Sequence, residues 1–470
     1  MPKYKYTAFP LVKRLRTVLL SDPPYCSGVL EVSPSNFELY YGRKDARFVD
    51  LLEASTSNDP HALEELAQSC ERAIFGRGDE AVLDQTYRKA GKMDSSHFKT
   101  GLDLANTGLL DAVRLSLLPD AVETRTVRAE LYRLNVYGEG AFFKSHKDTP
   151  RSQSMFGSLV IIFPTPHEGG ALILRHEDKE VTFDAAALLA GRTSSIAYIA
   201  FFGDVEHEVT PIVSGHRVTI TYNLSYGSVR KPAPPPLNLE TLQPPHASAL
   251  AVRDALSSLL DDATFLPQGG TLGSGLRHTY PLPYVCTRGR DDPLDSLEGW
   301  LKGSDALLFR TCGALGVRPL LRLVSERTDS EVMLDRMVEF SGFDISDTET
   351  ELRTYEGAVV LRSFGFTGNR RKPWARTTAR GYEEELSVHW VTRGGFGEGP
   401  CSPYAAYGNE PWLGWLYMRV CLIVKIGPYG RRSEEGEDMG DEEGVADEDE
   451  DEEDGKGEGE SDDAPSDAEN

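Results

Sequence analysis

The stretch YGEGAFFKSHKD, residues 137–148, decides the fold and ends in a His-x-Asp triplet. Side chains two apart on a β-strand point to the same face, so His146 and Asp148 can present an imidazole and a carboxylate to one ion. Such a pair suits Fe(II), Zn(II) or Mn(II). A second imidazole would complete a 2-His-1-carboxylate triad that leaves coordination positions open for chemistry. Because the chain has 10 histidines, the triplet alone is weak and needs support from elsewhere.

The second candidate segment is GDVEHEV, residues 203–209, which follows an apolar run and contains His207. Arg217 lies 10 residues further on and opens another alternating strand, on which Arg217 and Thr219 share a face. A guanidinium is shaped for bidentate binding of a carboxylate, and a neighbouring hydroxyl adds to that grip. The alternative for Arg217 by itself is a surface ion pair. Together with the His-x-Asp pair, we interpret Arg217 as part of a binding site for a dicarboxylate.

Residues 127–226 have the pattern of short strands separated by turns. Gly and Pro turns interrupt a series of short, largely apolar runs. The predicted strands are Ala129–Val136, Gly157–Phe163, Ala171–Arg175, Glu180–Phe183, Ser195–Phe202 and Arg217–Leu224. Several short strands with such turns are typical of a closed or double-sheet antiparallel fold of the jelly-roll kind.

These segments together resemble the prolyl 4-hydroxylase type of 2-oxoglutarate/Fe(II)-dependent dioxygenase. That family shows a Tyr-Gly-x-Gly stretch, an aromatic residue three positions before a histidine, and then His-x-Asp, as residues 137–148 do here. The run Leu159–Phe163 with the later Glu-Gly-Gly at 168–170 is similar to the family's strand and Gly-Gly turn. Residues 204–219 are similar to its closing strands. The resemblance covers roughly residues 128–226, about a fifth of the chain, with its four motifs in the family's order.

The resemblance implies a fold, a set of cofactors and a role for each matching residue. The fold is a double-stranded β-helix. The cofactors are Fe(II) and the cosubstrate 2-oxoglutarate, with ascorbate as an optional addition. The implied roles are iron ligands and catalytic residues at His146, Asp148 and His207, cosubstrate binding at Arg217 and Thr219, and pocket walls at Tyr137 and Leu172. The implied reaction gives succinate, carbon dioxide and a hydroxylated C–H bond.

One position departs from the family pattern. Family members often carry a tyrosine in the strand after His-x-Asp that bonds the cosubstrate, but here that strand is Leu159–Phe163, without a tyrosine. Tyr132, Tyr137 and Tyr222 are the candidates to replace it. Weaker cosubstrate binding is the alternative.

We therefore predict an Fe(II)- and 2-oxoglutarate-dependent dioxygenase (a hydroxylase), for which the resemblance suggests a protein or peptide prolyl residue as the substrate. Two alternatives stay open. One is the same chemistry on a small molecule, lipid or nucleobase. The other is a non-catalytic scaffold that binds proteins through the barrel and the acidic tail. An intact triad with Arg217 favours an enzyme, because a decayed site is expected to lose at least one of these residues.

The complete predicted fold class is α+β: a double-stranded β-helix with N-terminal helices packed on it and a further α+β C-terminal region. In the N-terminal support region, residues 1–126, the patterns predict two strands and three helical stretches. The strands are Gly28–Val32 and Phe37–Tyr41, and the helical stretches are Asp45–Arg72 with a break at Pro60, Glu80–Ala90 and Leu109–Leu118.

Beyond the core at 127–226, the patterns predict a Pro-rich linker at 227–246, an α+β region of unknown role at 247–430 and a disordered acidic tail at 431–470. The region at 247–430 is expected to contain helices Ala249–Leu260 and Asp305–Val324 and a strand Leu416–Ile426. A duplicated barrel and a helical cap both fit this pattern.

Charge and cysteine content restrict the partners. Residues 434–470 hold 21 Asp and Glu against one Lys, so they carry −20 of the net −24 and leave −4 for the rest. That balance makes nucleic acid an improbable partner, and no apolar stretch has membrane-spanning length. The six cysteines are widely separated, which suits a reduced, cytoplasmic or nuclear protein. The substrate, protein or small molecule, and the oligomeric state are unknown at this point.

Three further histidines are assigned no metal role. His167 and His176 flank the Gly-Gly turn, where solvent-exposed histidines are the common case. His216 adjoins Arg217 and should therefore point to the opposite face of the strand.

Overall fold

The computed structural model describes residues 9–42, 44–57, 61–77, 80–118, 125–177, 179–192, 194–229, 239–241, 249–283, 293–325, 332–337, 359–364, 385–393, 407–408, 415–418 and 420–433. These residues all belong to one compact unit. Among them no helix has both the length and the apolar character needed to cross a bilayer.

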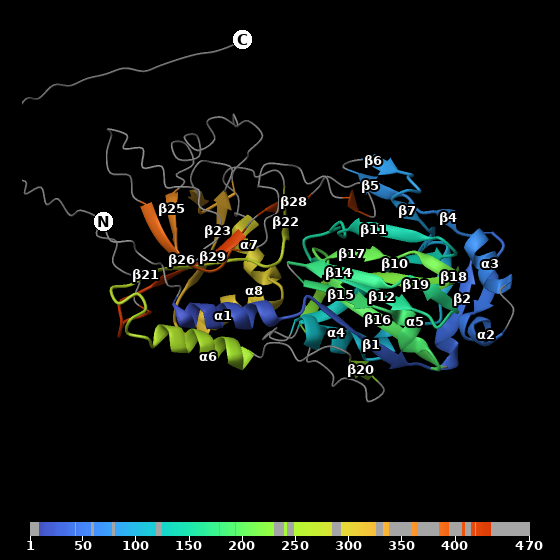
Figure 1. Cartoon of the computed structure of the whole chain (residues 1–470), viewed down its shortest axis with the longest axis horizontal. Coiled ribbons are helices and arrows are strands. Elements are labelled where there is room, and N and C mark those ends of the chain that lie inside the picture. The colour runs from blue at the N-terminus through green and yellow to red at the C-terminus, as the bar shows by residue number, and fades with distance from the viewer. Residues whose placement is uncertain are drawn as a thin grey trace, which may run out of the picture. The chain divides into compact units, whose positions relative to one another are not determined.

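Two antiparallel sheets form a jelly roll (Figure 1). The larger sheet has the strand order β20 (Leu239–Thr241), β1 (Tyr25–Glu31), β16 (Ser195–Phe202), β12 (Met155–Ile162), β19 (Arg217–Val229), β10 (Arg125–Tyr137), β8 (Gly91–Asp94), β4 (Glu71–Arg72). The smaller sheet has the order β15 (Lys179–Phe183), β14 (Leu172–His176), β17 (Glu206–Val209), β11 (Phe142–His146), β7 (Arg88–Lys89). The two-stranded sheet β13 (His167–Gly169) and β18 (Ile212–Gly215) and the short helix α5 (Ala185–Leu189) complete this part. The jelly-roll architecture and the six strands predicted within residues 127–226 are confirmed.

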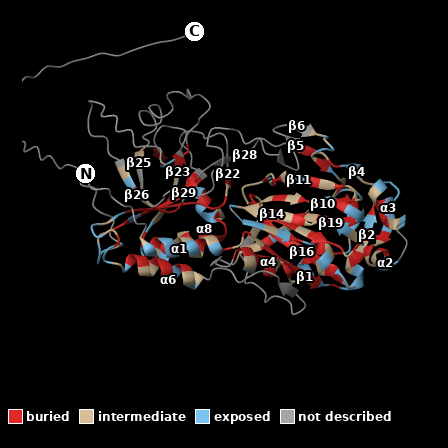
Figure 2. Ribbon diagram, in the orientation of Figure 1, coloured by how far each residue is buried: buried red, intermediate tan, exposed pale blue. Residues whose placement is uncertain are grey.

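Strand alternation gives the larger sheet two different faces. On β12, Leu159 and Ile161 are fully buried on one face. Ser158 and Ile162 point the other way, toward the smaller sheet. Figure 2 shows buried positions running along the strands of the larger sheet. Each large apolar side chain removed from water on these faces stabilises the fold by about 1.5–3 kcal/mol.

The N-terminal elements cover the apolar face of the larger sheet. They comprise η1 (Pro34–Phe37), β2 (Glu38–Tyr41), β3 (Arg47–Asp50), α2 (Leu51–Thr56), α3 (His61–Gln68), β9 (Phe98–Thr100), η2 (Leu104–Asn106) and α4 (Leu109–Leu117). Leu51, Leu66 and Leu109 belong to the same apolar core as Leu159, and α4 packs on β10 and β1. The helices therefore hold the sheet whose other face lines the site.

The described residues between 249 and 433 form a second apolar core, together with helix α1 (Pro10–Ser21). Six strands close a barrel in the order β21 (Gly270–Gly275), β26 (Glu385–Arg393), β25 (Val359–Phe364), β24 (Val332–Leu334), β23 (Pro319–Ser325), β29 (Val420–Ile426). The other elements are α6 (Ala249–Leu260), β22 (Tyr280–Pro283), α7 (Pro293–Leu297), η3 (Glu298–Trp300), α8 (Gly303–Ala314) and β28 (Trp415–Met418). β26 pairs in parallel with both β21 and β25, so this barrel does not repeat the pairing of the jelly roll.

The predicted helix Glu80–Ala90 is wrong. The described residues form β6 (Glu80–Val82), which pairs with β5 (Phe75–Arg77), and β7, which pairs with β11. Another short strand, β27 (Tyr407–Gly408), pairs with β5. The Asp84 carboxylate accepts hydrogen bonds from the backbone N and the hydroxyl of Thr86. This side-chain turn competes with a helix, and sheet pairing overrides the good helix propensity of the segment.

Three other predicted elements have different bounds. The stretch Asp45–Arg72 begins with strand β3, and its helix starts only at Leu51, after the Asp50 side chain caps the backbone N of Leu52 and Glu53. The helix predicted from Asp305 to Val324 ends at Ala314, because Gly316 has φ +76° and Pro319 starts β23. The strand predicted at 416–426 is two strands, β28 and β29, with different partners. By contrast, α4 and α6 confirm their predicted helices.

Candidate metal centre

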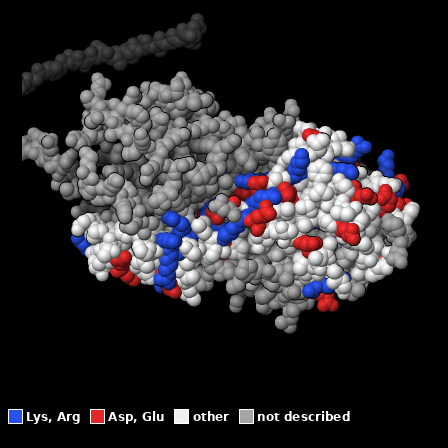
Figure 3. Space-filling view, viewed as in Figure 1, with Lys and Arg blue, Asp and Glu red and all other residues white. Residues whose placement is uncertain are grey.

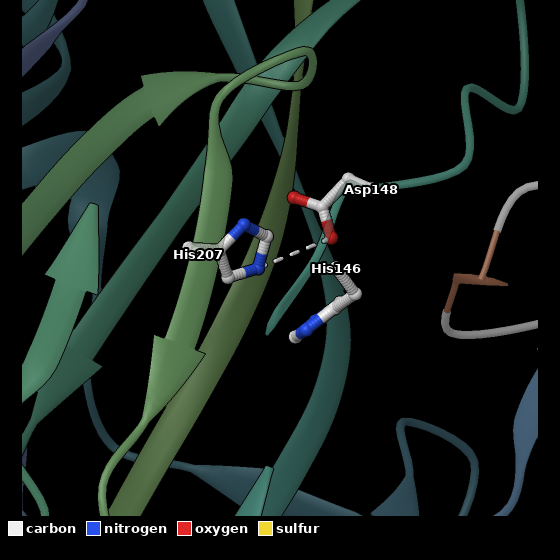
Figure 4. A group of neighbouring side chains, drawn as sticks. All are labelled: His146, Asp148 and His207. Atoms are coloured by element: carbon white, nitrogen blue, oxygen red, sulfur yellow. Dashed lines mark ion pairs between the residues drawn. The ribbon is translucent and has the colours of Figure 1, made fainter. Parts of the chain in front are cut away.

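Three side chains from two neighbouring strands meet inside the jelly roll. His146 ends β11, Asp148 follows two residues later, and His207 lies on β17. His146 and His207 are paired in the sheet register, and their ring centroids are 4.2 Å apart. One ligand atom from each of the three residues lies within 4.8 Å of the others. His207 Nε2 is 3.9 Å from Asp148 Oδ1 (Figure 4). The three side chains could hold one metal ion.

Backbone carbonyls fix the orientation of both imidazoles. Nδ1 of His146 is 2.8 Å from the carbonyl oxygen of Lys144, and Nδ1 of His207 is 3.0 Å from that of Val205. A carbonyl oxygen only accepts, so each Nδ1 carries the proton and Nε2 keeps its lone pair. Hydrogen bonds of this kind orient metal-binding histidines and select the tautomer that a divalent ion requires.

Asp148 is held at its backbone and at its carboxylate. Its backbone N donates to the carbonyl oxygen of Gly203 at 3.2 Å. The hydroxyl of Ser158 donates to Asp148 Oδ2 at 2.6 Å, and Asp148 Oδ1 is the oxygen nearer to His207. Since Ser158 lies on β12, the larger sheet positions a side chain that follows a strand of the smaller sheet.

The three side chains lie in buried, largely aromatic surroundings. His146, Asp148 and His207 are all buried. Phe143 stacks on His146 with ring centroids 3.5 Å apart, and Phe201 lies 4.7 Å from His207. Burial, with a smaller contribution from His207, lowers the pKa of His146 well below its ordinary value. The imidazole of His146 is therefore neutral at neutral pH, which is the form that binds a metal ion.

Arg217 is a buried cation inside the jelly roll. The residue is 2% exposed, and burial lowers the pKa of its guanidinium. Among the residues that the structure describes, its Nε has no hydrogen-bond partner, and no carboxylate forms an ion pair with it. A buried charge is costly unless it is paired. Arg217 is therefore suited to bind an anion that enters from outside the chain.

Arg217 and Thr219 both face the interior of the jelly roll. In the register of β19 and β10, Arg217 lies opposite Tyr137 and Thr219 lies opposite Asn135. The guanidinium carbon of Arg217 is 5.5 Å from the centre of the Tyr137 ring, and Thr219 is fully buried. Tyr137 is also hydrogen-bonded to Arg88. A carboxylate bound by Arg217 would therefore have two hydroxyl groups nearby.

The Gly-Gly turn makes room for the Arg217 side chain. Gly169 and Gly170 have φ values of +78° and +68°, a conformation that side chains disfavour. A Cβ at Gly170 would lie 2.2 Å from Cδ1 of Ile212 and 3.0 Å from Cδ of Arg217. Any other residue at position 170 would force the side chains of Arg217 and Ile212 to move.

Only one of the three candidate tyrosines lies against Arg217 in the described part of the chain. Tyr222 is on the opposite face of β19 from Arg217 and pairs with Leu159. The hydroxyl of Tyr132 accepts a hydrogen bond from Arg151 at 2.8 Å. Tyr137 alone has its ring beside the guanidinium.

Sequence patterns missed two residues next to the site. Ser158 bonds to Asp148, and its signal was a hydroxyl at an inward-facing position of an otherwise apolar strand. Arg88 donates to Asn135 Oδ1 at 3.0 Å, and its guanidinium lies over the ring of Phe143. The incorrect helix at 80–90 concealed Arg88, because the strand β7 aims it into the barrel.

The histidines that were set aside have different surroundings. His216 contacts Glu64, with Nε2 at 3.2 Å from Oε2, on the face away from Arg217 as expected. The prediction of an exposed His176 is wrong. Its side chain is 8% exposed and lies 3.6 Å from the carboxylate of Asp204. His176 meets Asp204 because the loop between β16 and β17 reaches the end of β14, and the alternation pattern of a strand does not predict such a contact.

Residues 132–225 match the family model described as the 2OG-Fe(II) oxygenase superfamily. The matched segment, about a fifth of the chain, contains the His-x-Asp pair, His207 and Arg217. It identifies this part of the chain as a 2-oxoglutarate-dependent oxygenase domain, and the family implies Fe(II) and 2-oxoglutarate. A search of curated proteins found no match.

Solved structures similar to the chain include three of prolyl hydroxylases. A prolyl-4-hydroxylase from Pseudomonas putida is 17% identical, with 46% of this chain and 100% of that chain covered and a TM-score of 0.28. A Trichoplax adhaerens prolyl hydroxylase, in complex with a hypoxia inducible factor oxygen degradation domain peptide fragment, is 16% identical, with 46% and 89% covered and a TM-score of 0.25. A prolyl 4-hydroxylase from Phytophthora capsici is 16% identical, with 48% and 68% covered and a TM-score of 0.23. At these scores the family match alone assigns the domain.

Proposed function

We propose that this chain hydroxylates a C–H bond of a protein or peptide substrate, with a prolyl residue as the target, using Fe(II) held by His146, Asp148 and His207 and 2-oxoglutarate held by Arg217. The observation that carries the proposal is the pairing of an oriented His-Asp-His cluster with a buried arginine that forms no ion pair with any described carboxylate, inside one jelly roll.

The three proposed iron ligands fit the donor set of a non-haem Fe(II) site. Two imidazoles and one carboxylate form a facial triad that leaves positions open. Val205 and Lys144 keep the two Nε2 lone pairs available, and Ser158 orients the carboxylate. These contacts would fix the donor atoms before the metal enters, which favours binding because little ordering remains to be done.

Arg217 and Thr219 would hold the distal carboxylate of 2-oxoglutarate. A guanidinium binds a carboxylate through two parallel hydrogen bonds, and Thr219 can add a third from the same face of β19. The ion pair would also remove the cost of an isolated charge in the barrel. Tyr137 is proposed to stand in for the tyrosine that is missing from β12.

When bound, iron and 2-oxoglutarate supply oxidative decarboxylation: one oxygen atom of dioxygen enters succinate, the other enters the substrate as hydroxyl, and carbon dioxide leaves. The chain's own residues orient these groups and exclude water. Phe143 and Phe201 pack on the two histidines and keep bulk water from the reacting centre. No side chain has to act as a general acid or base.

The choice of a prolyl residue rests on the similarity of residues 137–148 and 204–219 to the prolyl 4-hydroxylase type. Acidic and basic side chains are intermixed on the face seen in Figure 3. That mixture, with the near-neutral body of the chain, supports a protein or peptide rather than a polyanion as the substrate.

An anaerobic titration tests the cofactor assignment. Adding 2-oxoglutarate to the protein with Fe(II) should produce a weak charge-transfer band in the visible range, and air should then yield succinate. His146→Ala should abolish the band, and Arg217→Ala should shift its appearance to much higher 2-oxoglutarate. Wild-type behaviour of both variants would refute the assignment. The substrate is tested by searching a proteome for +16 Da peptides that form only with active enzyme, with hydroxyproline as the expected product.

A further inference from the structure

A second polar cluster lies beside the candidate metal centre, around the carboxylate of Asp204. Asp204 occupies the loop between β16 and β17, three residues before His207, and is 5% exposed. His176, Asp204 and His278 bring their polar atoms within 4.8 Å of one another. Lys302 also reaches the carboxylate, with Nζ 3.3 Å from Oδ1.

Most of the contacts to Asp204 come from residues 249–433. His278 Nδ1 is 3.2 Å from Asp204 Oδ2, and the backbone N of Thr279 donates to the same oxygen at 3.1 Å. Lys302 binds Oδ1 and also donates to the carbonyl oxygen of Thr279 at 2.9 Å. Only His176 belongs to the jelly roll. Asp204 therefore joins the loop before His207 to the second apolar core.

The segment that holds Asp204 is itself fixed. Asp305 accepts hydrogen bonds from the backbone N of Arg277 and of His278 and from the hydroxyl of Tyr280. Arg277 makes two hydrogen bonds to Glu177, at 3.2 and 3.1 Å, at the end of β14. The second core thus presents a rigid set of donors to the jelly roll.

The cluster has the character of a buried ion-pair network rather than of a second metal site. Both oxygens of Asp204 already accept hydrogen bonds, and a lysine ammonium is one of the donors. Burial by itself would raise the pKa of Asp204, but Lys302, His278 and His176 more than offset it and hold the pKa well below its ordinary value. The positive charge of Lys302 would repel a divalent ion, which could bind Asp204 only by displacing the lysine from the carboxylate.

Three consecutive residues of the loop each have a separate partner. The carbonyl oxygen of Gly203 accepts from the backbone N of Asp148 at 3.2 Å. Asp204 is bound by His278, Thr279 and Lys302. The carbonyl oxygen of Val205 holds Nδ1 of His207 at 3.0 Å. Any shift at Asp204 would therefore move contacts to two of the three proposed iron ligands. Asp148 and Lys302 also line one small cavity of about 10 Å³.

We propose that Asp204 is a positioning residue, through which Lys302 and His278 of the C-terminal region hold the loop 203–205 in the conformation that the iron site requires. Contacts from the C-terminal region would then be required for the geometry of the metal centre. This inference rests on the proposed function, because it concerns the geometry of the same iron site.

The test uses Co(II) in place of Fe(II), on the full chain, and measures the Co(II) affinity and the visible d–d spectrum. Asp204→Asn keeps the size of the side chain and removes its charge. It should weaken Co(II) binding by about 10–100-fold, the usual effect of losing a partner behind a metal ligand, and should change the spectrum. Lys302→Met should act in the same direction.

The matched control is Glu177→Gln, which breaks the ion pair with Arg277 between the same two cores. Within the described part of the chain, Glu177 forms no hydrogen bond or ion pair with loop 203–205. The substitution should lower the thermal stability and leave the Co(II) affinity and spectrum unchanged. Equal effects of Glu177→Gln and Asp204→Asn on Co(II) binding would overturn the proposal, because both would then act through stability alone.

The double variant Asp204→Asn/Lys302→Met removes both charges and so leaves neither one buried alone. The double variant is expected to fold even where a single variant does not. It should bind Co(II) no more weakly than Asp204→Asn does, because both substitutions break the same Asp204–Lys302 contact. Wild-type Co(II) affinity and spectrum in Asp204→Asn, or in the double variant, would refute the positioning role.

Two further outcomes separate this inference from its premises. A wild-type chain that binds no Co(II) would refute the proposed function itself. One equivalent of Co(II) per chain is expected. A second equivalent that His278→Gln eliminates would show that the cluster is a metal site, and would overturn the ion-pair interpretation.

Discussion

His146 and His207 lie opposite each other on β11 and β17, and each bonds its Nδ1 to the carbonyl oxygen of the residue two positions before it in the chain. This shared arrangement aims both Nε2 atoms at the space beside Asp148. Backbone carbonyls, one on strand β11 and one in the loop before β17, rather than other side chains, therefore set the tautomer of both imidazoles.

Replacing His207 with Ala should weaken Co(II) binding by more than the roughly 10–100-fold typical of losing a partner behind a ligand, because a ligand itself is lost. His216→Ala is the matched control: it removes a nearby imidazole whose contact is with partly exposed Glu64. Titration with Co(II), followed by its visible absorption, measures both. Similar losses in the two variants would speak against a metal role for His207.

Arg217→Met should separate stability from cosubstrate binding. Without 2-oxoglutarate, none of the carboxylates that the structure describes forms an ion pair with this buried cation, so methionine should raise the free energy of unfolding, on the order of 1 kcal/mol. Wild-type protein should gain about 2.7 kcal/mol from 2-oxoglutarate at 100 times its Kd, and the variant should lose that gain. Thermal unfolding with and without 2-oxoglutarate measures both effects.

Arg133→Met is the control for this experiment. Arg133 is equally buried in the same jelly roll but has an acidic partner, with Nε 3.2 Å from Asp94 Oδ1. Its loss should lower the stability and leave the response to 2-oxoglutarate intact. If both variants keep that response, Arg217 does not bind the cosubstrate.

Gly170→Ala should weaken 2-oxoglutarate binding while leaving Co(II) binding intact. The new methyl group would meet Ile212 at 2.2 Å and Arg217 at 3.0 Å, so the guanidinium must move. Gly191→Ala is the matched control, because Gly191 has a similar φ of +73° but no atom within 4 Å of a Cβ. Both alanine variants should be destabilised by the same backbone strain, about 1–2 kcal/mol. The 2-oxoglutarate Kd of Gly191→Ala should equal that of wild type, and an equal Kd in Gly170→Ala would contradict the packing argument.

The stability of the metal-free chain should fall as the pH drops below about 6.5, with His278 as one cause. Burial lowers the pKa of His278. Asp204 and Asp305 offset this only in part, and His176 lowers the pKa further. The unfolded chain then takes up a proton near pH 6.5 while the folded chain does not, so acid favours unfolding. The contribution of His278 to stability is complete above about pH 6.5. It is lost progressively as the pH falls from about 6.5 to the lower pKa that His278 has in the folded chain.

His278→Gln should flatten this dependence, by at most about 1.4 kcal/mol per pH unit. Denaturant unfolding between pH 5 and pH 7.5 measures the difference between variant and wild type. An unchanged slope in His278→Gln would show that His278 takes up no proton on unfolding in that range.

Local sequence was sufficient where a short apolar run had to be buried within a sheet. The runs Gly157–Phe163 and Ser195–Phe202 predicted strands that the structure contains, with almost every position buried, and the 3.6-residue period at 249–260 predicted α6. It was insufficient at 80–90, where helix-forming residues make short strands. The pairing partner of β7 is β11, more than fifty residues away, and no local preference encodes it.

The sequence by itself determined which side chains share a face. Because the period of a strand is two, Arg217 had to point the same way as Thr219. The same period predicted that His146 and Asp148 share a side, and they do, although Asp148 lies just beyond the end of β11. Only the tertiary structure decided what these pairs meet: His207 through the register of β17, Ser158 through the other sheet, and Asp204 through residues of the second core. The physical reason is that such contacts depend on how distant strands pair and how two cores pack, and a residue's neighbours in the chain carry no information about either.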